Sequence, residues 1–155
     1  LPQVSVGLQH KSNQSFALPS AVGATDDSDT DYYLSAAKAW LDGPFHRTWV
    51  ANVTARRTRA NQIGLLGFGG DVDDSAEWVA EASVAAFINR YWAVGVEYRQ
   101  KPDNLSFAEE QDWRDVFVAY FPSKRVSIVG AYTDLGSIAG LDDQTGWYLS
   151  LQAAF

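Results

Sequence analysis

Apolar residues recur at every second position in eight separate segments of the chain. Successive side chains of a β-strand point to opposite faces, so this alternation predicts strands with one apolar and one polar face. Trp147, Leu149 and Leu151, for example, alternate with Tyr148 and Ser150. The predicted strands cover about residues 1–10, 31–41, 48–58, 78–89, 92–99, 113–121, 125–134 and 145–155.

The connections between these segments alternate between long and short. Residues 11–30, 59–77, 100–112 and 135–146 are long and polar, whereas 42–47, 90–91 and 122–124 are short. This order is typical of antiparallel hairpins with all long loops at one end. We therefore predict an all-β fold, an up-and-down antiparallel transmembrane β-barrel of eight strands that forms one domain over residues 1–155. A soluble barrel of the lipocalin kind is the alternative, with its apolar face turned inward.

The tryptophans lie near strand ends, while the strand centres carry Ala, Val, Leu and Ile. Amphipathic rings collect at the two membrane–water interfaces, so two aromatic belts are expected of a spanning barrel. The belts would contain Trp40, Trp49, Trp78, Trp92, Trp113 and Trp147.

Acidic and basic residues are concentrated at opposite ends of the predicted strands. The long connections hold most of the acidic residues, and the short turns hold His46, Arg47, Arg90, Lys124 and Arg125 with only Asp42 as an acid. This separation predicts two chemically different ends, with acidic loops outside the cell and short turns in the periplasm.

The polar face of the strands would form the interior of the barrel. Charged residues within a narrow interior must pair with one another, because an unpaired buried charge costs several kcal/mol. We predict a network of Arg56, Glu81, Glu97, Arg99 and Asp115, with Lys38 also facing inward. A structural, salt-bridged filling is favoured over a transport path or an active site.

The last predicted strand ends the chain with an apolar face. Its apolar face holds Trp147, Leu149, Leu151 and the terminal Phe155. This pattern resembles the signal by which the bacterial barrel assembly machinery recognises its substrates. An ordinary amphipathic strand of a soluble sandwich is the alternative.

Composition excludes several classes of function. The net charge of −7 argues against nucleic acid as a partner. The absence of Cys rules out thiolate chemistry and disulfides, and 2 His make a His-rich metal site improbable. No apolar run reaches the length of a membrane helix, but a barrel strand needs only about 9–11 residues. The chain begins at Leu1 rather than Met, which predicts a processed or truncated chain.

Two weak candidates for chemistry remain. His10, near Ser12, is a candidate base for acyl transfer or deacylation of lipids, although the spacing is not diagnostic. Asp71, Asp73 and Asp74 offer oxygen ligands for a hard cation, but they lack the spacing of an EF-hand loop. A polar interface residue and a solvated acidic loop are the simpler interpretations. We expect no catalytic residue, no metal centre and no cofactor.

Several stretches carry a family resemblance. Residues 98–106, 115–122, 134–140 and 146–152, together with 58–62 and 64–70, resemble an uncharacterised proteobacterial outer-membrane β-barrel family, a domain of unknown function. The resemblance covers most of the chain. It implies that the chain corresponds to the C-terminal part of a longer barrel, and it brings no known activity and no catalytic residues.

These observations predict a non-enzymatic protein of the bacterial outer membrane that serves as an anchor, scaffold or binding surface. Its expected partners are outer-membrane lipids and lipopolysaccharide, bridged by divalent cations, and the barrel assembly machinery. A passive pore for small solutes is the first alternative, and a lipid-modifying enzyme that uses His10 is the second.

Overall fold

The structure is a computed structural model that describes residues 1–107, 109–138 and 140–154. Its strands are β1 (Gln3–Ser12), β2 (Ser28–Trp40), β3 (Trp49–Thr58), β4 (Glu77–Phe87), β5 (Trp92–Arg99), β6 (Trp113–Ser123), β7 (Val126–Asp134) and β8 (Thr145–Ala153). Three short helices lie in the connections: α1 (Ala17–Ala21), η1 (Pro44–His46) and η2 (Asn61–Gly64).

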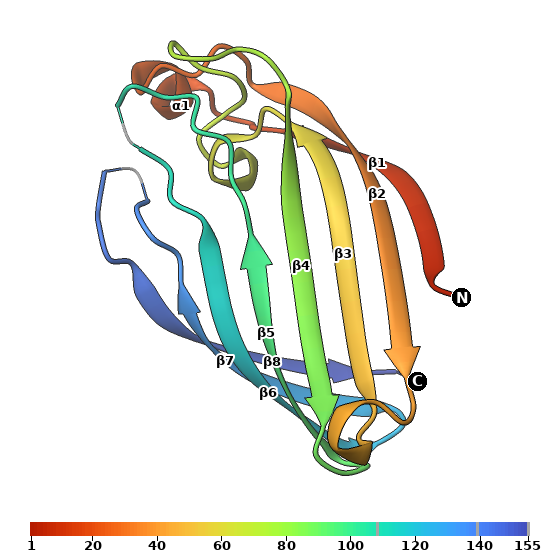
Figure 1. The fold of residues 1–155 in the computed structure, drawn as a ribbon. Coiled ribbons are helices and arrows are strands. Elements are labelled where there is room, and N and C mark those ends of the chain that lie inside the picture. The colour runs from red at the N-terminus through yellow and green to blue at the C-terminus, as the bar shows by residue number, and fades with distance from the viewer. Residues whose placement is uncertain (108, 139, 155) are drawn as a thin grey trace.

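All eight strands form one antiparallel sheet in the order of the sequence. Each strand therefore pairs with its sequence neighbours, as expected of successive hairpins. The sheet curls strongly, and the long connections gather at one end while the short turns occupy the other (Figure 1). The eight strands and their up-and-down order confirm the sequence prediction.

The sheet is not closed, which corrects the prediction of an eight-stranded barrel. Within the described residues, β1 pairs only with β2 and β8 pairs only with β7. Alternation and loop length specify neighbouring hairpins, but they are the same in an open sheet and in barrels of different width. Closure depends on strand tilt and on the stagger between strands, which these patterns do not encode.

The two faces of the sheet differ in chemistry as predicted. One face, here called the apolar face, exposes large side chains from every strand. Its exposed residues include Val6, Leu34, Val53, Trp78, Val96, Val116, Tyr132 and Leu149. The other, called the polar face, is more enclosed and carries the buried strand residues Asp31, Thr54, Thr58, Val79, Ala93, Ala119 and Ala131.

None of the helices in the described part of the chain has the length and apolar character needed to cross a membrane.

The most tightly packed region lies outside the sheet. The long connections 13–27, 59–76, 100–112 and 135–144, here called the loop cap, meet above one end of the strands. Phe68 at its centre is completely buried, and its backbone forms antiparallel bridges with Asp26 and Ala60. Ala24, Leu66 and Leu105 form a small apolar cluster beside it.

Two buried amides connect the loops of this cap. Asn61 Nδ2 donates to the carbonyl of Gly69 at 2.7 Å, and Asn104 Nδ2 donates to Asn61 Oδ1 at 2.9 Å. Both side chains are fully buried, so their hydrogen bonds replace water that the amides would otherwise bind. Arg59 adds ion pairs to Asp26, Asp29 and Asp74 at 2.7–3.0 Å. These connections were predicted to be long, polar loops, whereas the structure shows an ordered, cross-linked unit.

Gly70 lies where the cap leaves no room for a side chain. A Cβ at this position would meet the carbonyl oxygen of Asn104 at 2.0 Å. Because that oxygen belongs to backbone, Gly70→Ala forces the two loops apart, and we expect a loss of about 1–3 kcal/mol. Hydrogen exchange of residues 59–76 measures this loss. Gly130→Ala, where nothing lies within 4 Å, is the matched control and should leave exchange unchanged. Equal exchange in the two variants would contradict the packing described here.

Candidate functional site

An ionic network on the polar face is the first candidate site. Glu81 of β4 accepts from Arg56 Nε of β3 at 2.7 Å and from Arg99 Nη2 of β5 at 2.7 Å. Arg56 also reaches Asp31 of β2 at 3.4 Å, and Lys11 of β1 pairs with the same carboxylate at 2.7 Å. The network thus crosses five neighbouring strands near the loop cap.

The strand register explains why these side chains meet. Glu81 lies directly opposite Arg99 on β5 and opposite Thr54 on β3, two residues before Arg56. Side chains that are opposite or diagonal on one face of an antiparallel pair lie within reach of each other. The predicted association of Arg56, Glu81 and Arg99 is therefore present in the structure.

Asp31 and Lys11 also belong to the network, although neither was predicted to do so. Asp31 is completely buried, and it follows the acidic segment 26–29, which was predicted to belong to a polar loop. Lys11 lies beyond the predicted end of the first strand. Asp31, Tyr33 and Ser35 occupy every second position of β2 and therefore lie on the same, polar face. This spacing could have placed the carboxylate of Asp31 on that face.

Glu97 and Asp115 form a second, separate part of the predicted network. They face each other across β5 and β6. Together with Asn52, Ser83 and Trp113 they line a hollow of about 370 Å³ that also reaches Glu81 and Arg99. Asp115 Oδ1 and Trp113 Nε1 are buried and have no hydrogen-bond partner among the described residues. The hollow is therefore lined by two carboxylate side chains, and next to it two buried polar atoms lack a partner among the described residues.

Lys38 does not face this interior. The register pairs Lys38 with Ala51, so it lies on the apolar face, and its ammonium sits 5.0 Å from the ring of Trp40 near the short-turn end. Lysine can extend its charged group along an apolar surface towards water, so a position near the strand end accommodates it. The prediction that Lys38 points inward is wrong.

The tryptophans lie near strand ends, as predicted, but not all on one face. Trp40 and Trp49 are paired on the apolar face. On the same face Trp92 stacks against Tyr120, and Trp147 meets Tyr132 edge to face. Trp78 is also exposed on this face. Trp113 differs, because it lies on the polar face opposite Arg99, where the ammonium of Lys101 sits 5.2 Å from its ring.

The apolar side chains of the terminal strand are exposed. Trp147, Leu149 and Leu151 of β8 are 85%, 78% and 70% accessible, and they continue the apolar face to the edge of the sheet. Phe155, the last member of the predicted assembly signal, lies outside the described residues.

His10 and the three aspartates at positions 71, 73 and 74 form hydrogen bonds to different partners. His10 Nδ1 lies 3.0 Å from Thr30 Oγ1, and in the described ranges its ring meets no carboxylate. Asp71 accepts from the amide and hydroxyl of Ser106, Asp73 accepts from the amide of Ser75, and Asp74 accepts from Arg59. Across residues 1–107, 109–138 and 140–154, no cluster of three His, Cys, Asp or Glu is arranged to hold a metal ion.

A buried ion pair in the loop cap adjoins the site. Lys101 Nζ lies 3.8 Å from Glu110 Oε2, and the two side chains are 2% and 1% exposed. Burial raises the pKa of Glu110 to about 7, although the amide of Gln62 and the charge of Lys101 act in the opposite direction. Burial likewise lowers the pKa of Lys101.

This burial makes the stability of the cap depend on pH. The pKa of Glu110 is raised from 4.5 to about 7, so the folded chain holds a proton that the unfolded chain releases in this range. The free energy of unfolding should therefore fall as pH rises from about 4.5 to 7, by on the order of 3 kcal/mol from this group.

Urea unfolding at several pH values measures the effect. Glu110→Gln keeps the shape of the neutral acid and should flatten the dependence over this range. Glu109→Gln changes the charge of the exposed neighbouring side chain and serves as the control. A Glu110→Gln variant with the slope of the parent protein would refute the assignment.

Comparison with known proteins identifies a family but no characterised relative. No curated protein and no solved structure matches the chain. Residues 1–152 match the family described as "Protein of unknown function (DUF3034)". Because the match extends over nearly the whole chain, the protein belongs to the DUF3034 family.

Proposed function

We propose that this chain is an integral protein of the bacterial outer membrane and that its curved sheet forms the wall of a transmembrane β-barrel. In this proposal the apolar face contacts lipid and the polar face lines the interior. The protein acts without catalysis, as an anchor, scaffold or binding surface, and it presents the loop cap outside the cell.

The observation that carries the proposal is the exposed apolar face. It extends across all eight strands, from Val6 on β1 to Leu149 on β8, and its large side chains are exposed. Soluble monomers rarely expose contiguous apolar patches larger than a few hundred Å². Contact with lipid removes the free-energy cost of exposing this apolar surface to water. The enclosed polar face with its ionic network supports an interior that excludes lipid.

A membrane location also constrains the free edges of the sheet. Hydrocarbon offers no hydrogen bonds, so the backbone groups at the open edges of β1 and β8 need partners. The two edges must pair with each other or with further strands before the wall is complete. Pairing with each other gives a narrow, filled barrel, whereas further strands give a wider one.

The proposed partners follow from the two ends and the last strand. The acidic loop cap favours contact with anionic lipopolysaccharide through bridging divalent cations. The apolar face of β8, with Trp147, Leu149 and Leu151, supports recognition by the barrel assembly machinery.

A passive pore for small solutes is the second candidate. It is favoured by the hollow of about 370 Å³ between Glu97, Asp115 and Arg99, which the ionic network leaves unfilled. The third, a lipid-modifying enzyme, gains little support, because the partner of His10 is the hydroxyl of Thr30.

Arginine substitutions on the two faces of β4 test the membrane location. Ala82 lies on the apolar face and its neighbour Ser83 on the polar face. If lipid covers the apolar face, Ala82→Arg should lower the free energy of unfolding in vesicles by about 2–4 kcal/mol, and Ser83→Arg should lower it much less. Urea titration of the chain refolded into phosphatidylcholine vesicles provides the measurement. A soluble protein would tolerate Ala82→Arg well. Similar, small decreases in the free energy of unfolding of both variants would therefore contradict the proposal.

Ion conductance separates the filled barrel from the pore. The full chain, refolded in detergent and inserted into a planar bilayer, should be silent if the ionic network fills a barrel of eight strands. Discrete current steps would instead establish an open interior, closed by further strands. Asp115→Asn should then change the cation preference of the current, because Asp115 lines the hollow.

A further inference from the structure

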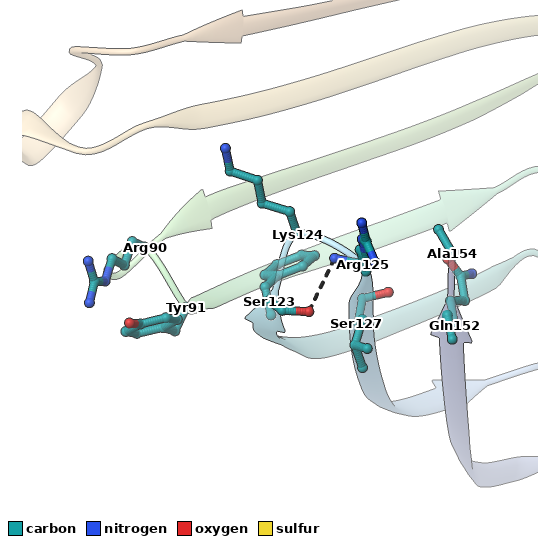
Figure 2. Close-up of a pocket in the computed structure, with 11 residues that line it drawn as sticks. Arg90, Tyr91, Ser123, Lys124, Arg125, Ser127, Gln152 and Ala154 are labelled. Atoms are coloured by element: carbon teal, nitrogen blue, oxygen red, sulfur yellow. Dashed lines mark hydrogen bonds between the residues drawn. The ribbon is translucent and has the colours of Figure 1, made fainter.

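The short-turn end of the sheet contains a basic pocket that neither the ionic network nor the loop cap includes. The β4–β5 turn, the β6–β7 turn and the end of β8 line an open hollow of about 650 Å³. Arg90, Lys124 and Arg125 are three cationic residues among its lining, and Ser127 and Gln152 add polar residues from the polar face. In Figure 2 the side chains of Arg90 and Lys124 extend outward from this space. These five residues are here called the basic rim.

No carboxylate in the part of the chain that the structure describes neutralises the cations of the basic rim, because none of them forms an ion pair with Arg90, Lys124 or Arg125. The acid at this end of the sheet, Asp42, is already paired with His46 at 3.0 Å. The acidic residues of the loop cap lie at the opposite end of the strands (Figure 1). A mobile anion is therefore the available partner for this positive charge.

The local structure holds the rim in a defined position. The amide of Arg125 donates to Ser123 Oγ at 3.2 Å (Figure 2). The amide of Ala154 donates to the carbonyl of Arg125 at 2.8 Å. The guanidinium of Arg90 stacks 4.5 Å from the ring centre of Tyr91. Stacking occupies the face of a guanidinium and leaves its N–H groups free to donate in the plane.

This combination of groups suits a phosphate group. Phosphate offers several acceptor oxygens and a charge that Arg and Lys bind through short, charge-assisted hydrogen bonds. The Ser127 hydroxyl and the Gln152 amide supply neutral donors on the inner side of the same pocket. A carboxylate ligand would satisfy fewer of these donors, because it has fewer oxygens to share among them.

We propose that the basic rim binds a phosphate group, either as a free anion or as the headgroup of an acidic phospholipid. The lipid source rests on the proposed membrane location, because it requires this rim to lie at the level of the headgroups. The free-anion source does not depend on it.

Calorimetric titration of the full chain in non-ionic detergent tests the site. The probes are inorganic phosphate and dihexanoyl-phosphatidylglycerol, with dihexanoyl-phosphatidylcholine as the zwitterionic control. The triple variant Arg90→Gln, Lys124→Gln, Arg125→Gln should bind the anionic probes about tenfold more weakly or not at all. The matched control, Lys38→Gln, Arg57→Gln, Arg114→Gln, removes the same charge from exposed positions elsewhere and should bind as the parent protein does.

The outcomes distinguish the two sources of phosphate. Binding of both anionic probes, lost in the rim variant alone, supports the site as stated. Binding of phosphatidylglycerol alone assigns the site to lipid, and binding of inorganic phosphate alone assigns it to a free anion. The proposal is overturned if neither probe binds, if the control variant loses binding equally, or if phosphatidylcholine binds as well as phosphatidylglycerol.

Two further measurements keep the test independent of folding and of membrane insertion. Arg125→Lys preserves the charge and should retain binding, and far-UV circular dichroism checks the β-content of every variant. Added NaCl should weaken binding to the parent protein, because salt screens exposed charges. Failure of the Ala82→Arg test with intact phosphate binding would reject the membrane location and leave the phosphate site standing.

Discussion

The separation of two chemistries onto the two faces of one sheet is the constraint on which the rest of the structure depends. Every second residue of each strand faces the same way, so a shift of one residue in any hairpin would exchange the apolar and polar sets. The register observed from β1 to β8 keeps the apolar side chains together across all strands. Arg56, Glu81 and Arg99 meet only because this register is maintained.

The charged groups are distributed according to how far water can reach them. On the polar face, Asp31 has no exposure and is held by Lys11 and Arg56, which is the arrangement expected of an enclosed charge. At the short-turn end, Lys124 and Arg125 line an open pocket, and no described residue forms an ion pair with them. The charges around Asp31 and Glu81 thus stabilise one another, whereas those at the short-turn end are open to solvent.

Much of the sheet was predictable from the sequence, because strand alternation and hairpin connections are local properties. The predicted and observed limits of β3 differ by a single residue, and the positions of Glu81 and Arg99 followed from the alternation alone. The open edges were not predictable in this way, since β1 and β8 are far apart in sequence and no local pattern specifies their distance. Lys38 was misplaced because its charge was given more weight than the alternation around it.

The loop cap beside the candidate site was not predictable from the sequence, because its contacts join residues that are far apart in the chain. Asn61, Asn104 and Phe68 are polar or isolated residues in segments without periodicity, so nothing in their neighbourhood indicated burial. Their contacts join positions more than forty residues apart, such as Asn104 and Asn61, and Gly70 allows the backbone of Asn104 to approach closely. The acidic composition of these loops indicated exposure to solvent, although several of their residues are buried.

The interlocking of the loop cap limits how its segments can change over evolutionary time. Segment 59–76 is in contact with each of the other long connections, through Asp26, Asn104 and Ser137. A change of length or shape in one loop therefore disturbs surfaces supplied by the other three. These loops are expected to vary as a group, so a chimera that exchanges one of them between relatives will need compensating changes in the rest.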